Sequence, residues 1–289
     1  MKIRILGVGC IALIVTSLLG GCAVNQSRQR TSIVDYLYPK NTQQVIEPSI
    51  PTLKLPLSVG IAFVPNPQSQ PGAPNLWSGR VDQNNLTEET KMALLQKVQS
   101  HFEKLDFVSD IQLIPSAYLT PEGGFNNLNQ IQNMFGIDEI ALVSYDQVQF
   151  TDEGALSLTY WTLIGAYVVS GEKNDTSTML DTAVYDIKSQ KMLFRAPGMS
   201  RVKGSSTLVN LSDQLRKDSV TGFNQATEQM IKNLDIQLKL FKEKVKSNPD
   251  KFKVEHKKGY TGGGAFGPVM LILLLIAGCI FRLRFRQTD

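Results

Sequence analysis

The sequence is poor in the side chains that most catalytic and metal sites require. Its 289 residues include only two histidines and three cysteines. Three cysteines cannot form a disulfide framework, and two of them, Cys10 and Cys279, lie in apolar runs near the ends of the chain. Between these runs only Cys22 remains, so we exclude redox pairs and cysteine-ligated zinc from the middle of the chain.

The motifs of common enzymes are also missing. No Gly-x-Ser-x-Gly elbow, P-loop or His-Glu-x-x-His pattern occurs. We interpret His101 and His256 as structural, and the acidic pairs 138–139 and 152–153 as ordinary residues of turns and element ends. We therefore expect no catalytic residue, no metal site and no cofactor, and we do not expect an enzyme.

The N-terminus has the features of an export signal. Lys2 and Arg4 precede a 15-residue apolar run, Ile5–Leu19, which is shorter than the roughly 20 residues of a membrane span. The cleavage region that follows, Leu19, Gly20 and Gly21 before Cys22, resembles a bacterial lipobox. The resemblance implies that signal peptidase II removes residues 1–21 and that Cys22 carries diacylglycerol and a third acyl chain such as palmitate. The alternative is an ordinary secretory signal.

Three acyl chains exceed the two lipid signals that stable membrane anchoring requires. Lipoproteins that stay in the inner membrane have an Asp after the lipidated cysteine, whereas this chain has Ala23. By this resemblance the mature protein belongs in the outer membrane or on the cell surface.

The C-terminus contains a second membrane signal. Residues 265–281 form an uncharged run of 17 residues, followed by Arg282, Arg284 and Arg286. As a helix the run would cover about 26 Å, which suits a thin bilayer. We predict a transmembrane helix with a cytoplasmic Arg-rich tail, residues 282–289, because the chain before it is exported. A buried core helix is the alternative.

A flexible segment, Gly262, Gly263 and Gly264, stands directly before the predicted span. Intramembrane proteases need backbone that is not protected by helical hydrogen bonds. Glycines, apolar span and terminal arginines together resemble the GlyGly-CTERM sorting signal, which implies cleavage by rhombosortase, a rhomboid-family intramembrane protease. With the lipobox and the segment 32–39 (SIVDYLYP), the chain resembles the rhombotarget lipoprotein family. The alternative is an uncut hinge.

The middle of the chain predicts one α/β or α+β domain, a mixed sheet with helices packed on it, over residues 57–246. Residues 22–56 are expected to form an extended linker after the lipid, and residues 247–264 a basic, glycine-rich stalk. Helices are predicted over 87–105, over 125–135 with Gly136 as its stop, and after Ser212 with Gly222 as an interruption. The predicted strands are 57–64, 107–114, 140–150, 156–169, 176–187 and 192–202.

The sequence of this domain contains fewer indications of function than the two ends of the chain contain of processing. Residues 136–143 (GIDEIALV) are similar to the N-terminal α/β domain of TolB-like and CsgG-like envelope proteins. We favour a binding or assembly module without enzymatic activity; the alternatives are a surface-displayed hydrolase and a CsgG-like secretion or assembly component. Asp35, Tyr36 and Tyr38 either dock the N-terminal segment on the domain or contact an envelope protein partner.

The charge distribution excludes nucleic acid as a partner. The formal net charge of +4 falls to zero when the two predicted sorting signals are removed. Residues 23–238 contain 17 basic and 22 acidic residues, whereas residues 239–258 contain eight lysines and three acids. We expect this basic stretch to contact anionic lipid head groups.

Overall fold

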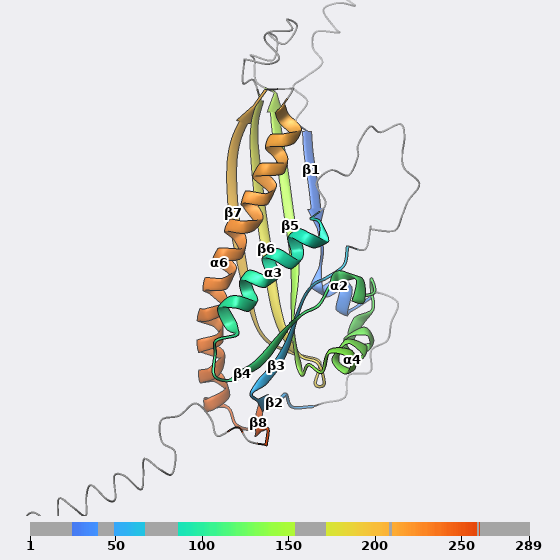
Figure 1. Ribbon diagram of the computed structural model, residues 1–289, viewed down its shortest axis with the longest axis vertical. Helices are drawn as coiled ribbons and strands as arrows, with labels where there is room; N and C mark the ends of the chain where they lie inside the picture. Colours follow the sequence, from blue (N-terminus) through green and yellow to red (C-terminus); the bar gives the residue numbers. More distant parts are fainter. Residues whose placement is uncertain are drawn as a thin grey trace, which may run out of the picture.

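The computed structural model describes residues 25–39, 49–66, 86–153, 172–207, 210–258 and 260. In these ranges a mixed sheet carries helices on both faces, and its longest strands run along the long axis of the molecule beside one long helix (Figure 1). This is the α/β architecture with a mixed sheet that the sequence predicts.

The sheet has a parallel part and an antiparallel part that share one strand, β5 (Glu139–Glu153). β3 (Leu57–Phe63) lies parallel to β4 (Val108–Leu113) and to the first third of β5. On the other side of β5, two long strands continue the sheet in antiparallel order, β6 (Glu172–Asp186) and β7 (Lys191–Ser206). The strand order is β4-β3-β5-β6-β7.

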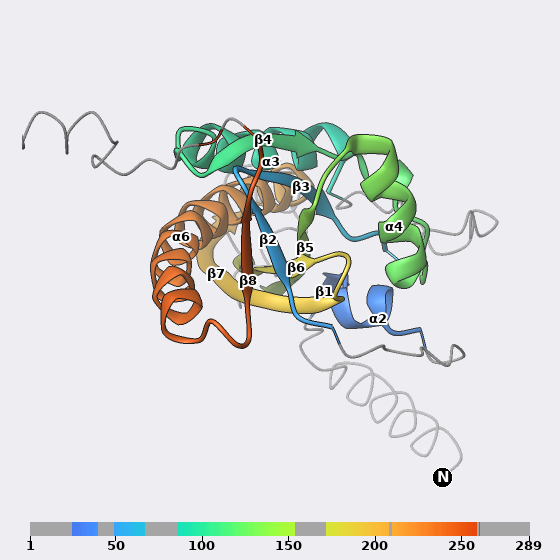
Figure 2. The ribbon, with the colours of Figure 1, turned by 90° about the horizontal axis from the view of Figure 1, so that it is seen from below.

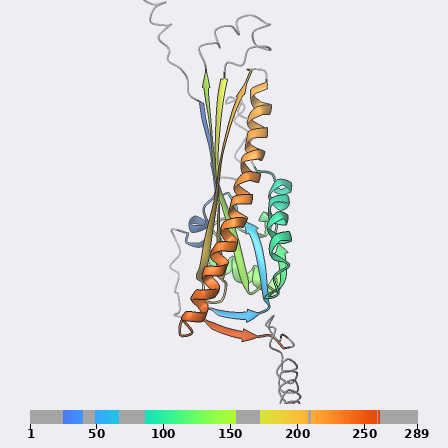
Figure 3. The ribbon, with the colours of Figure 1, turned by 90° about the vertical axis from the view of Figure 1, so that its left-hand side faces the viewer.

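A further strand, β1 (Asn25–Arg30), pairs with β5 where β3 has ended. Its pairing is antiparallel, with Asn25 opposite Thr151 near the end of β5. We call this end of the molecule the β1 end. At the opposite end, a parallel pair of short strands, β2 (Thr52–Leu55) and β8 (Lys253–His256), lies across the start of the long strands (Figure 3). We call it the β8 end.

Two helices, α3 (Glu88–Phe102) and α6 (Leu211–Ser247), cover one face of the sheet (Figure 2). α3 begins at Thr87, whose hydroxyl accepts a hydrogen bond from the amide of Thr90 at 3.2 Å, as an N-cap should. α6 runs through Gly222 without a break, so the predicted interruption is wrong. A Cβ at this position would lie 2.5 Å from Thr178 Oγ1, and glycine is therefore what lets α6 approach β6.

The other face of the sheet is covered at the β8 end by α2 (Ile33–Leu37) and α4 (Gly124–Phe135). α4 ends as the sequence predicts, because Gly136 adopts the left-handed conformation with a φ of 64°. A 3-10 turn, η1 (Ser116–Tyr118), precedes it. The apolar core is thus divided by the sheet into one cluster under α3 and α6 and another under α2 and α4.

Toward the β1 end, α6 packs on the sheet through polar side chains. Gln147 Nε2 donates to Thr178 Oγ1 at 2.7 Å, while Ser219 Oγ donates to Gln147 Oε1 at 2.6 Å. Gln149 bridges the same elements by donating to Thr176 Oγ1 and to the Leu215 carbonyl. Because all of these side chains except Leu215 are buried, the hydrogen bonds also satisfy groups that water does not reach.

The structure extends the folded region beyond the predicted domain limits. The stretch treated as an extended linker, 22–56, contains β1, α2 and β2, and the stretch treated as a stalk, 247–264, contains β8. β5 pairs directly with β6, and the strand predicted over 156–169 lies outside the described residues. Within the described ranges no helix is long and apolar enough to cross a membrane, and the predicted span 265–281 lies outside them.

Candidate functional site

The most unusual polar group in the described structure is the carboxyl group of Glu139. Glu139 is the first residue of β5 and is paired in register with Asp186 at the end of β6. Only 1% of its surface is exposed, and neither carboxyl oxygen has a hydrogen-bond partner among the described residues. Burial, reinforced by the neighbouring charges of Asp138 and Asp186, raises the pKa of Glu139 to about 8.

Two lysines lie close to Glu139 but bond to its neighbour. Lys54 Nζ, from β2, is 3.1 Å from Asp138 Oδ1, and Lys257 Nζ, after β8, is 3.2 Å from Asp138 Oδ2. Both lysines oppose the rise in the pKa of Glu139 without cancelling it. The third carboxylate, Asp186, accepts a hydrogen bond from the Ser189 amide at 2.9 Å. Glu139 is therefore the member of this group whose carboxyl is left without a donor.

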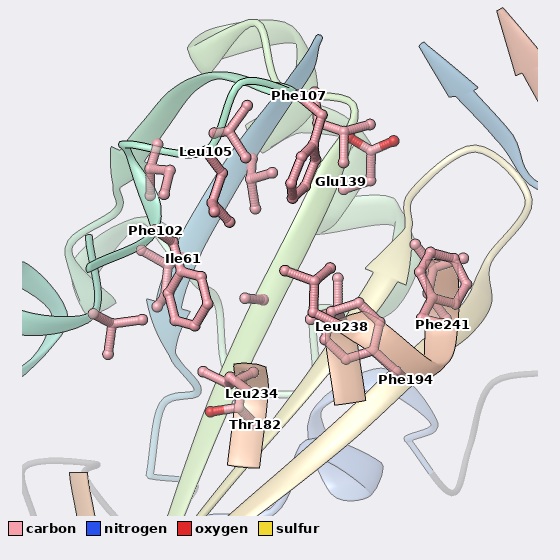
Figure 4. Close-up of a pocket in the computed structure, with 18 residues that line it drawn as sticks. Ile61, Phe102, Leu105, Phe107, Glu139, Thr182, Phe194, Leu234, Leu238 and Phe241 are labelled. Atoms are coloured by element: carbon pink, nitrogen blue, oxygen red, sulfur yellow. The ribbon is translucent and has the colours of Figure 1, made fainter. Parts of the chain in front are cut away.

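Glu139 lines an apolar cavity of about 100 Å³ between the sheet and the helices α3 and α6. Figure 4 shows Glu139 beside Phe107 at one end of the cavity, with Thr182 and Leu234 at the other. Every lining residue other than Glu139 and Thr182 is apolar; the apolar set is Leu57, Val59, Ile61, Val98, Phe102, Leu105, Phe107, Val108, Ile111, Ala141, Val184, Leu193, Phe194, Leu234, Leu238 and Phe241.

A lysine side chain lies over one of the aromatic rings that line the cavity. Lys242 of α6 places its ammonium 3.7 Å from the centroid of the Phe107 ring, a cation–π contact. Burial lowers the pKa of Lys242. The surface that the lining residues present to the cavity is apolar, and neither carboxyl oxygen of Glu139 is exposed in it.

The arrangement does not provide the parts of a catalytic or metal centre. Thr182, the other polar residue at the cavity, donates its hydroxyl hydrogen to the sulfur of Met230 at 2.8 Å. In the ranges that the structure describes, no group of three His, Cys, Asp or Glu side chains is placed to hold a metal ion.

The structure places Asp35, Tyr36 and Tyr38 in and directly after α2. Ser32 caps this helix by accepting a hydrogen bond from the Asp35 amide at 3.1 Å. Tyr36 is buried and donates its hydroxyl hydrogen to Asn127 Oδ1 at 2.8 Å, which fastens α2 to α4. Tyr38 is 41% exposed, with its ring edge-to-face to Phe125. Tyr36 therefore docks the N-terminal segment, and Tyr38 retains an outward surface.

The remaining residues singled out in the sequence fall into two groups. His101 Nε2 lies 2.9 Å from Asp235 Oδ2 at the surface between α3 and α6, and His256 stacks on Tyr260. The processing residues lie outside the described residues, so their roles stay predictions: Leu19, Gly20, Gly21, Cys22, Gly262, Gly263, Gly264, Arg282, Arg284 and Arg286.

Sequence reasoning missed the special position of Glu139, which it treated with Asp138 as an ordinary acidic pair. The available signal was its place directly before the apolar run 140–143, where a strand enters the core. The lysines and the aromatic rings around it come from segments as distant as 54 and 257, so spacing along the chain does not reveal them.

No protein-family model matches the chain, and no curated protein matches it. Several solved structures are similar to it, and two of them are described here. One is a PelC dodecamer from Paraburkholderia phytofirmans, with 10% sequence identity, a TM-score of 0.29 and coverage of 74% of this chain and 96% of the other. The second is a homologue of the neuraminyllactose-binding hemagglutinin from Helicobacter pylori, with 14% identity, a TM-score of 0.39 and coverage of 74% and 97%.

Proposed function

We propose that the protein is an envelope lipoprotein, lipidated at Cys22 and cleaved near Gly262–Gly264 by a rhomboid-family protease of the rhombosortase type. After cleavage it is held in the outer membrane or at the cell surface by its acyl chains. There the folded domain serves as a non-enzymatic binding module.

The observation that carries this proposal is that the described residues nearest to the two processing segments lie at opposite ends of the fold. β1 begins at Asn25, three residues after Cys22, and pairs at the β1 end with Thr151. Tyr260, two residues before Gly262, contacts His256 of β8 at the opposite end. Between Glu139 and Thr151 alone, β5 rises about 40 Å. A precursor with both anchors is thus tethered at both ends, and cleavage leaves it held only by the β1 end.

The position of the cavity supports a binding role for the cleaved form. Its lining comes from β3, β4, α3, the beginnings of β5 and β7, the end of β6 and the C-terminal half of α6, toward the β8 end. Lipid at Cys22 would attach at the β1 end, so the cavity lies far from the remaining anchor. Removal of the C-terminal span would then separate the cavity from the membrane.

Variants of the two processing segments test this proposal in the source bacterium. Replacing Cys22 by Ser should abolish acylation, and replacing Gly262–Gly264 by three valines should leave the precursor uncut and in the inner membrane. Gly259→Val, outside the glycine triplet, is the matched control and should be processed normally. Normal cleavage of the triple-valine variant, or normal membrane retention of Cys22→Ser after cleavage, would overturn the proposal.

A further inference from the structure

The cavity between the sheet and the helices α3 and α6 is apolar and narrow. The carboxyl oxygens of Glu139 are closed off from it, so its walls offer a ligand no hydrogen bond. Its volume of about 100 Å³ compares with the ~150 Å³ cavity that accommodates benzene, so it holds about four carbon atoms. Its wall on β3 extends from Leu57 to Ile61, a length of about 13 Å. An unbranched alkyl chain fits this space, and a ring does not.

One side of the cavity is closed, and the other reaches the surface. The lining residues Leu105, Phe107 and Leu238 are only partly buried, whereas Ile61 and Leu234 are buried. Figure 4 shows Leu105 and Phe107 together at one end of the cavity and Leu234 toward the other. The mouth of the cavity therefore lies beside Leu105 and Phe107.

A line of side chains on α6 leads from the closed side of the cavity to its mouth. Leu234 and Leu238, one turn apart, line the cavity, and Lys242 and Lys246 occupy the next two turns of the same face. Lys242 Nζ lies 3.7 Å from the centroid of the Phe107 ring, which holds a positive charge at the mouth. The helix thus presents apolar groups inside the cavity and cationic groups at its opening.

The charge at the mouth favours an anion. Burial and the neighbouring charge of Lys246 both lower the pKa of Lys242, and Asp106 opposes them. In the described ranges neither lysine forms an ion pair. A bound carboxylate would accept hydrogen bonds from these ammonium groups and reduce their mutual repulsion.

We propose that the cavity binds a medium-chain fatty acid, with the methyl end of the chain between Ile61 and Leu234 and the carboxylate at Lys242 and Lys246. The acyl chains expected at Cys22 belong to the β1 end, so the ligand is a separate molecule. This proposal rests on the proposed function only in treating the domain as a binding module. Lipidation and cleavage are measured separately, so a failure here leaves that part of the account unchanged.

Calorimetric titration of the full-length protein with octanoate tests the proposal. The protein is held in phosphatidylcholine nanodiscs, and empty nanodiscs correct for partitioning into lipid. One octanoate per chain should bind, about tenfold more tightly than n-octylamine, which carries the opposite charge. Acetate, which lacks the chain, should not bind detectably.

Two lysine variants test the position of the carboxylate. Lys242→Gln should weaken octanoate binding about fivefold and leave the binding of octan-1-ol unchanged, because the alcohol carries no charge. Lys217→Gln removes an exposed lysine from α6 near the β1 end and should leave both affinities unchanged. Equal octanoate affinity in the wild type and in Lys242→Gln would overturn the proposal.

The position of the chain is tested by the shape of the ligand and of the cavity. Cyclohexanecarboxylate has the same charge but a ring, and the wild-type protein should bind it about tenfold less tightly than octanoate. Ala141→Val fills part of the cavity and should weaken octanoate and octan-1-ol alike. Equal binding of the ring compound, unchanged octanoate binding by a folded Ala141→Val variant, or no octanoate binding beyond that of empty nanodiscs would each overturn the proposal.

Discussion

At the scale of single residues, Glu139 destabilises the fold whenever it is ionised. A carboxyl group whose pKa is higher in the folded state binds more protons folded than unfolded. Its pKa is raised from 4.5 to about 8, so the contribution of Glu139 to stability is fully present below pH 4.5 and is lost as the pH rises from 4.5 to 8. Above pH 8 this contribution is constant, and the total loss is about 5 kcal/mol.

Replacing Glu139 by Gln removes this titration. We expect the free energy of unfolding of Glu139→Gln to vary less with pH than that of the wild type, and to exceed it by several kcal/mol at pH 9. Urea denaturation at pH 5, 7 and 9 measures the difference. Glu228→Gln provides the control, since its side chain is exposed. Parallel stability profiles for wild type and Glu139→Gln would show that the carboxyl group is not buried as described.

A second residue-scale prediction concerns the attachment of α2. Tyr36→Phe removes the hydroxyl that donates to Asn127 and leaves the buried ring in place, so we expect a loss of about 1 kcal/mol. Tyr38→Phe changes the same chemical group on a more exposed ring and should change stability by less than about 0.5 kcal/mol. Thermal denaturation of both variants and of the wild type measures the two losses of stability. Equal effects would mean that Tyr36 does not fasten α2 to α4.

Tyr36 shows what the sequence alone could not predict about a single residue. The sequence left open whether Tyr36 docks the segment or meets a partner, because a tyrosine serves both purposes equally well. The structure places its ring in the core. Burial of one side chain depends on elements distant in sequence, here α4, and no local pattern around residues 32–39 contains that information.

At the scale of elements, the packing of α6 on β7 depends on the absence of a side chain at Gly198. A Cβ there would lie 2.1 Å from the Ala226 carbonyl oxygen and 2.7 Å from the Met230 amide nitrogen. Backbone atoms of a helix cannot move aside singly, so the whole helix would have to shift.

We therefore expect Gly198→Ala to cost about 3 kcal/mol or more of the free energy of unfolding, because it separates α6 from β7. Gly136→Ala is the comparison: this glycine has a φ of 64° and no atom within 4 Å of the added Cβ, so only backbone strain of about 1 kcal/mol is expected. Urea denaturation of the two variants measures which of them loses more free energy of unfolding. A smaller loss for Gly198→Ala than for Gly136→Ala would contradict the described helix–sheet contact.

The sequence predicted the helices and strands in which apolar residues repeat with a regular spacing. It missed the strands that form only because their backbone pairs with a strand distant in sequence. α3, α4 and α6 follow from apolar side chains at helical spacing, and β3, β4, β5, β6 and β7 from apolar or alternating runs. β1, with the sequence NQSRQR, has no apolar alternation and becomes a strand because its backbone pairs with β5. β8, with KVEH, is similar, since its partner β2 lies about 200 residues earlier.

At the scale of the whole molecule, the account depends on two attachment points at opposite ends of an elongated domain (Figure 1). The sequence predicts the two processing signals but not that the described residues next to them, Asn25 and Tyr260, lie at opposite ends of the sheet, because the long strands between them set that separation. Under the proposed processing, cleavage would change a domain tethered at both ends into one whose cavity, near the β8 end, lies away from the lipid anchor.

The mass of the intact protein extracted from membranes of the source bacterium tests this central claim most directly. The account predicts a chain that begins at a triacylated Cys22 and ends between Gly262 and Ala265. A protein that begins at Cys22 and still ends at Asp289 would contradict the claim of cleavage. A chain that begins elsewhere without lipid would contradict the claim of anchoring at the β1 end.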